Sequence, residues 1–152
     1  MQNKTEWNGK FIITIKNKTD TEVIEIKNVI TNTGLNMIRD ALAGLLTDGQ
    51  LKYLAVGTSS TSISFTDTQL GGEFFRTQFV DQNVTSTGVL NSNTILLENE
   101  GVGQIQEIGI FAGSTASSAT NSGIMISRIL FSRNKTNLES IQFQRVDTIG
   151  RG

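Results

Sequence analysis

The stretch KFIITIKNKTDTEVIEIKNV, residues 10–29, is the part of the chain that decides the fold class. Phe11, Ile13 and Ile15 occupy alternate positions, and the alternation of apolar residues returns after the turn-forming residues 17–20. Side chains at alternate positions lie on one face of a β-strand. The stretch therefore predicts a β-hairpin that packs one of its faces against a core.

One segment has helical rather than strand-like spacing. Its apolar residues fall mostly three or four positions apart, at Leu35, Ile38, Leu42, Leu45 and Leu46. We expect one amphipathic helix near residues 33–47, capped by Asn32 or Thr33 and ended by Gly49. Because isolated helices of this length are marginal in water, this helix is expected to lie against a sheet.

Further strands are predicted at residues 51–56, 73–80, 94–97, 104–111, 124–131 and 138–146. Two stretches rich in Ser and Thr, residues 57–69 and 113–122, are long enough to be mobile or functional loops. About eight strands and one helix favour a mainly β fold, a single antiparallel β-sandwich of the jelly-roll type. This one domain spans residues 1–152, with an N-terminal arm (1–9) and a flexible C-terminal tail (147–152).

The composition excludes several classes of function. The net charge is −1, so no basic field favours nucleic acid or an anionic membrane surface. The chain has no His and no Cys, which excludes Ser-His-Asp triads, thiol nucleophiles, disulfides and the usual zinc and haem sites. No cofactor and no metal are expected. No stretch approaches the ~20 apolar residues of a membrane-spanning helix, so no membrane insertion is expected.

Carboxylates are the remaining candidates for catalysis. A glycosidase needs two of them facing each other across a cleft at roughly 5 to 10 Å. Glu98 with Glu100, or Glu73 with Glu107, are the candidate pairs. The segment that contains Glu98 and Glu100 is more typical of a turn between two strands, and we expect no enzyme.

Two arginines and two glutamates fall on apolar strand faces, at Glu73, Arg76, Glu107 and Arg128. Alternation places Arg128, for example, on the same face as Ile126. A charge on an apolar face is costly unless it is paired. We therefore predict a structural charge network that pairs Glu73 and Glu107 with Arg76 and Arg128. The alternatives are faces that meet solvent or a neighbouring subunit, and a binding site.

Trp7 and Tyr53 are the single Trp and the single Tyr of the chain. Tyr53 lies within the nearly continuous apolar run over residues 51–56, which we expect to be buried on both faces, and Tyr53 is expected in the core. Trp7 precedes the first predicted strand, and we expect it at an interface with a neighbouring molecule. Aromatic residues do not alternate with a basic patch, as binding of single-stranded nucleic acid would require, so no nucleic-acid partner is expected.

Five short motifs follow one another between residues 31 and 131: NTGLNMIRDALAG (32–44), LKYLAVGT (51–58), TQLGGEFFR (68–76), QEIGIF (106–111) and GIMISR (123–128). Their order resembles a group of small structural proteins of tailed bacteriophages, described as tail-fibre, baseplate or tail-collar proteins. The resemblance implies a β-sandwich component of the virion without catalytic residues. The hairpin over residues 10–30 lies outside the shared pattern, and residues 148–152 carry no receptor-binding module. Both departures favour an adaptor or short appendage over a long fibre.

The expected function is thus structural: a tail-associated subunit that is made in the cytoplasm of the host bacterium, is located in the virion, and contacts copies of itself and other phage virion proteins. A capsid decoration or head-fibre protein is an alternative within the same class. A host-receptor or carbohydrate-binding module is a second class, with residues 57–69 and 113–122 as recognition loops. A carboxylate glycosidase is the third.

Overall fold

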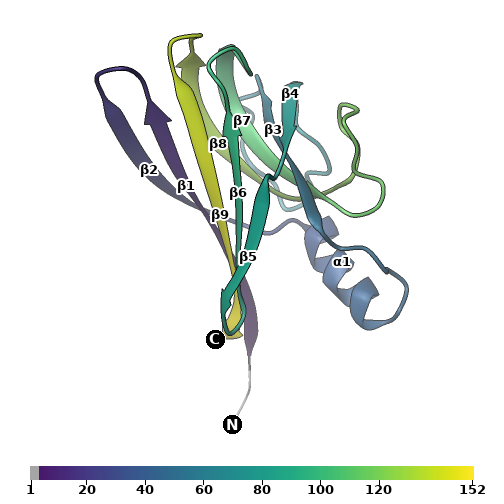
Figure 1. Ribbon diagram of the computed structural model, residues 1–152. Coiled ribbons are helices and arrows are strands. Elements are labelled where there is room, and N and C mark those ends of the chain that lie inside the picture. The colour runs from purple at the N-terminus through teal and green to yellow at the C-terminus, as the bar shows by residue number, and fades with distance from the viewer. Residues whose placement is uncertain (1–3) are drawn as a thin grey trace.

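The computed structural model describes residues 4–152 and consists of two antiparallel sheets that pack against each other, with one helix beside them (Figure 1). The predicted β-sandwich is confirmed. The first sheet has the order β2 (Thr21–Asn28), β1 (Thr5–Lys16), β9 (Ser140–Arg151), β6 (Val89–Leu96) and β5 (Asp81–Ser86). The second sheet has the order β4 (Glu73–Gln78), β3 (Leu51–Gly57), β7 (Gly103–Ala112) and β8 (Ile124–Lys135).

The main core lies between the two sheets. Phe11, Ile13 and Ile15 all face it, as their alternation predicts, and β1 and β2 pair as the predicted hairpin. The second sheet contributes alternate residues of β3, such as Leu54 and Val56. Burial of apolar side chains from both inner faces is what holds the two layers together.

A second, smaller apolar cluster lies on the outer face of the sheet that contains β3. Its buried members are Tyr53, Ala55, Leu70, Phe111 and Met125. Leu70 comes from the loop over residues 58–72, which covers this face. The strand β3 is therefore buried on both faces, which confirms the prediction from its continuous apolar sequence.

The helix α1 (Asn32–Leu42) begins after Thr31, whose side chain accepts a hydrogen bond of 3.1 Å from the backbone N–H of Gly34. It ends at Ala43, and Gly44 then takes a positive φ of 71°. The predicted helix is confirmed, but the predicted caps are wrong. Thr31 is the N-cap. The glycine that ends the helix is Gly44 rather than Gly49, because a left-handed residue is needed directly after the C-cap Ala43.

The hairpin formed by β5 and β6 was not expected in full from the sequence. Its side chains are mostly polar, so apolar alternation does not mark it. Cross-strand side-chain hydrogen bonds accompany its backbone pairing: Asn93 donates to Asp81 at 2.7 Å and Asn91 donates to Thr85 at 3.2 Å. The described residues thus form nine strands.

Both chain ends belong to strands. Strand β1 pairs with β9 along its whole length, from Thr5 opposite Arg151 to Lys16 opposite Ser140. The expected arm and flexible tail are therefore wrong for residues 5–9 and 147–151, which pair with each other; residues 1–3 lie outside the described part. These ends and the tip of the β5–β6 hairpin project together beyond the sandwich and beside α1 (Figure 1). We call this projection the stem, residues 4–9, 82–91 and 147–152.

Candidate functional site: two anchored loops and an apolar groove

A buried ion pair joins the neighbouring strands β7 and β8. The Nε of Arg128 donates to Oε2 of Glu107 at 2.7 Å, and the two side chains are 3% and 0% exposed. Both lie on the outer face of their sheet, beside the small cluster around Phe111. A charge-assisted hydrogen bond of this length offsets much of the cost of burying the two charges.

This pair holds the loop over residues 58–72 against the sheet. Glu107 accepts hydrogen bonds from the backbone N–H groups of Gly72 at 2.8 Å, Gly71 at 3.0 Å and Ser59 at 3.2 Å. Arg128 donates to the carbonyl of Ser59 at 3.4 Å and forms a second ion pair with Asp67 at 3.3 Å. Both ends of the loop and one residue within it are thereby fixed.

A second ion pair lies within β4. Arg76 donates through Nε and one terminal nitrogen to the two oxygens of Glu73, each at 2.8 Å, and both side chains are almost completely buried. The Arg76 guanidinium also lies over the rings of Phe111 at 4.5 Å and Tyr53 at 5.3 Å. Its planar group thus has both hydrogen-bonding and stacking partners, which a lysine does not reproduce.

The Glu73–Arg76 pair holds the loop over residues 113–123. Arg76 donates to the carbonyls of Ser117 at 2.9 Å and Ser122 at 3.1 Å. Glu73 accepts from the backbone N–H of Asn121 at 3.2 Å. Each of the two loops rich in Ser and Thr is therefore anchored by its own buried ion pair.

The four residues of the predicted charge network all lie on one sheet face, but as two separate pairs. Among residues 4–152, no hydrogen bond or ion pair joins Glu73 or Arg76 to Glu107 or Arg128. The predicted shared face of Arg128 and Ile126 is wrong, because Ile126 belongs to the main core. A register shift between β7 and β8 leaves Ile126 unpaired and changes which alternate positions face outward.

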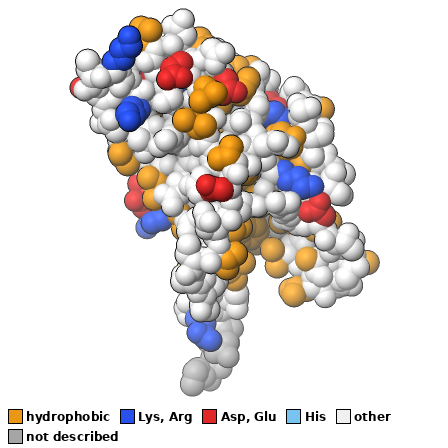
Figure 2. Space-filling view, in the orientation of Figure 1, with side chains coloured by type: hydrophobic (Ala, Val, Ile, Leu, Met, Phe, Trp, Pro, Cys, Tyr) orange, Lys and Arg blue, Asp and Glu red, His pale blue; other side chains and the backbone are white. Residues whose placement is uncertain are grey.

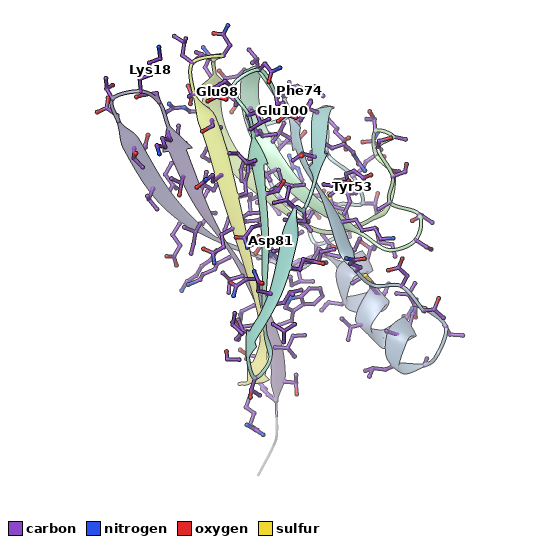
Figure 3. The ribbon with its side chains drawn as sticks, in the orientation of Figure 1. Lys18, Tyr53, Phe74, Asp81, Glu98 and Glu100 are labelled. Carbon is purple, nitrogen blue, oxygen red and sulfur yellow. The ribbon has the colours of Figure 1, made fainter. Side chains whose placement is uncertain are left out.

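Neither candidate carboxylate pair lines one cleft together: Glu98 lines a surface pocket beside the β1–β2 turn, but Glu100 does not. Glu73 and Glu107 are buried and accept hydrogen bonds from arginine and backbone N–H groups, as described above. Glu98 and Glu100 lie in the turn after β6, at the end of the sandwich far from the stem (Figure 3). Glu100 accepts a hydrogen bond of 2.9 Å from the backbone N–H of Leu97, which closes that turn. For Glu73, Glu107 and Glu100 this geometry is that of structural carboxylates.

A third buried charge cluster was missed by the analysis of the sequence. Arg145, with no exposed surface, donates to Asp147 at 2.9 Å and to the hydroxyl of Ser127 at 3.0 Å. Its guanidinium lies 4.9 Å from the centre of the Phe11 ring. The signal for it was the alternation along β9, because Ile141, Phe143, Arg145 and Asp147 are consecutive members of one buried face.

Trp7 belongs to the same cluster. Its Nε1 donates to Asp147 at 2.8 Å, and its half-buried ring packs against the main core.

A buried lysine closes the other end of the sandwich: the Nζ of Lys135 donates to the carbonyls of Leu97, Glu98 and Thr136 at 2.9 to 3.3 Å. Burial lowers the pKa of Lys135, because desolvation disfavours its charged form.

An apolar groove of about 360 Å³ lies between the stem and α1. Orange apolar side chains line this space in Figure 2. Among the described lining residues the only charged one is Asp147, which already accepts from Arg145 and Trp7. Outside this lining, Lys52 donates to the Asp48 carboxyl at 2.7 Å, and this hydrogen bond lowers the pKa of that carboxyl. The apolar lining of the groove includes Trp7, Met37, Ile38, Val84, Leu90 and Ile149.

The helix beside the groove exposes the apolar side chains of Leu35, Ile38 and Leu42, and Leu45 follows it directly after the left-handed Gly44; we call these four residues the ridge. Their exposed fractions are 52%, 36%, 86% and 78%. The helix does pack against β8, as expected, but through Gly34 and Met37 rather than through the ridge. Gly34 allows this close approach, because a Cβ there would lie 3.0 Å from the carbonyl oxygen of Ile126.

Comparison with protein-family models, with curated proteins and with solved structures found no match for this chain. Within residues 4–152 there is no group of three or more His, Cys, Asp or Glu side chains placed to hold a metal ion. Helix α1, the helix of this part of the chain, is too short and too polar to cross a membrane. The candidate functional surfaces of the described residues are the two anchored loops, the groove and the ridge.

Proposed function

We propose that this chain is a structural subunit of a tailed-bacteriophage particle, associated with the tail as a fibre, baseplate or collar component and acting as an adaptor or short appendage. The observation that carries the proposal is the exposed apolar surface of the ridge and groove on a rigid β-sandwich. Monomeric soluble proteins rarely expose such contiguous apolar surface without a partner. The order of the five sequence motifs supplies the link to phage virion proteins.

The buried charges support a structural role. The Glu73–Arg76, Glu107–Arg128 and Arg145–Asp147 pairs are each buried, and each fixes a loop or a chain end. Buried ion pairs contribute little net stability, but losing one partner is costly. Such pairs suit a subunit whose surfaces must hold one shape when it meets its neighbours.

Immunogold labelling of intact particles with an antibody against this chain tests the proposal. Gold at the tail, or at its junction with the head, is the expected result. Gold spread over the capsid would favour a decoration or head-fibre protein instead. Particles that carry no gold, while antibodies against other virion proteins label them, would contradict a role in the exposed virion.

A host-receptor or carbohydrate-binding module is the second candidate. The observation that favours it is the loop over residues 58–72, which is fixed at both ends yet exposes Ile63 and Phe65 at 43% and 62%. Rigid loops with exposed apolar tips are common recognition surfaces. A receptor-binding protein would coat host cells as a purified protein and compete with intact phage, and Phe65→Ser would abolish both effects.

A further inference from the structure

We infer that the apolar groove is occupied by a second copy of this chain, whose ridge on α1 inserts between the stem and the helix of the first copy. The inference deepens the proposed function, since it rests on the chain being a subunit present in several copies and names the partner of its apolar surface. It also says which part of the partner is buried.

The ridge and the stem leave much apolar surface uncovered. Besides the four ridge residues, Val84 and Ile149 on the stem are 85% and 46% exposed. Together these six side chains expose on the order of 400 Å² of apolar surface. The ridge lies on one side of the proposed contact and the two stem residues lie on the other, so this area is about a quarter of the ~1,600 Å² that both partners of a standard interface bury together. A polar rim from the stem and helix can supply the remainder.

The ridge and the groove carry almost no unpaired charge. The ridge has no charged residue, and the two charged residues of α1, Arg39 and Asp40, pair with each other at 2.8 Å. The only charge that the described residues bring to the groove, on Asp147, is neutralised by Arg145 at 2.9 Å. Such a surface cannot select a charged peptide or a headgroup. A second copy suits it, since the net charge of −1 brings little repulsion.

One chain presents both halves of the proposed contact. The ridge projects from α1 and is apolar, the groove beside it is concave and apolar, and the two surfaces share one residue, Ile38, at their border. When a convex patch of one copy enters a different, concave patch of the next, the contact is heterologous and repeats from copy to copy. Closure of that repeat gives a ring, which is an arrangement suited to a subunit of a particle with rotational symmetry.

Cysteine cross-linking tests the inference, because the chain has no cysteine of its own. Leu42→Cys on the ridge and Val84→Cys in the groove are prepared as separate proteins, mixed, and oxidised with copper phenanthroline. We expect mixed disulfide dimers in at least tenfold excess over a mixture of Val84→Cys with Leu138→Cys. Leu138 is the matched control, since it is 72% exposed and lies in the β8–β9 turn.

The oligomeric state provides the second readout. Light scattering after size exclusion is expected to show an oligomer for the wild type and for Leu138→Glu, and a monomer for Leu42→Glu. Leu42 is 86% exposed, so Leu42→Glu is expected to keep the wild-type circular dichroism spectrum, while its melting temperature loses only the contribution of association.

Three results would overturn the inference. A wild-type chain that stays monomeric at millimolar concentration would overturn it. This holds even if the groove of that monomer binds an apolar dye, because the occupant would then not be a second copy. Disulfides of Leu42→Cys with itself alone would show a ridge-to-ridge contact instead. Retention of the oligomer by Leu42→Glu would place the contact elsewhere. If the purified chain is a monomer but immunogold finds it on phage tails, only this inference is contradicted. If the purified chain is an oligomer but immunogold finds none on particles, only the proposed function is contradicted.

Discussion

The Nε of Arg128 lies 2.7 Å from the carboxylate of Glu107, with both side chains buried on neighbouring strands. Glu107 also accepts three backbone N–H groups of the loop over residues 58–72. The pair is thus the point at which this loop joins the sheet. The Glu73–Arg76 pair has the same relation to the loop over residues 113–123, and the two pairs can be tested separately.

Arg128→Met is expected to lower the free energy of unfolding by about 3 kcal/mol, because it leaves Glu107 as a buried charge without its arginine. Chemical denaturation measures the change. Hydrogen exchange should show lost protection in residues 58–72 and unchanged protection in residues 113–123. Arg39→Met is the control, since the exposed Arg39–Asp40 pair is worth at most about 1 kcal/mol. Unchanged stability of Arg128→Met would rule out a structural role for the buried pair.

Arg76→Lys keeps the positive charge but loses the forked contact to Glu73 and the stacking on Phe111. We expect a loss of about 2 kcal/mol in the free energy of unfolding, typical of lost hydrogen bonds to a charged group. Hydrogen exchange should quicken in residues 113–123 alone. Equal loss of protection in both loops would show that the two ion pairs act as one network.

Asp147→Ala removes the acceptor of Trp7 and the partner of Arg145. We expect a loss of about 3 to 5 kcal/mol, because the buried arginine is left uncompensated. Trp7 is the single tryptophan, so its fluorescence reports on this site and should shift to longer wavelength as its ring becomes solvated. Asp81→Ala, on the exposed strand β5 (Figure 3), should leave both stability and emission nearly unchanged. An unaltered emission in Asp147→Ala would contradict the assigned contact.

Gly57→Ala is expected to destabilise the protein by about 1 to 3 kcal/mol, as overpacking does. The reason is that an added Cβ would collide with the carboxylate of Glu107. Gly49→Ala is the matched control, because its Cβ would find no atom closer than 3.8 Å, and it should stabilise by up to about 1 kcal/mol. Thermal melts of the two variants check the difference, and equal melting temperatures would remove the steric argument.

Much of the fold could be predicted from local patterns. Alternation in residues 10–29 predicted the β1–β2 hairpin, and helical spacing predicted α1. The candidate charges were found by the same means, since Glu107 and Arg128 stand out within apolar runs. Arg145 lies within the predicted strand over residues 138–146, but its partner Asp147 lies in the residues assigned to a flexible tail, so the buried pair was not predicted.

The sequence by itself determined the mainly β class, the hairpin, the helix and the doubly buried strand β3, because periodicity and apolar content are properties of a short segment. Tertiary structure alone decided the rest. A single unpaired residue, Ile126, changes the face on which Arg128 lies, and the polar strand β5 forms only because β6 supplies hydrogen-bond partners. The ridge of α1 faces solvent because Gly34 and Met37 bring the opposite side of the helix against β8. Which apolar face is covered depends on what else the folded chain places beside it.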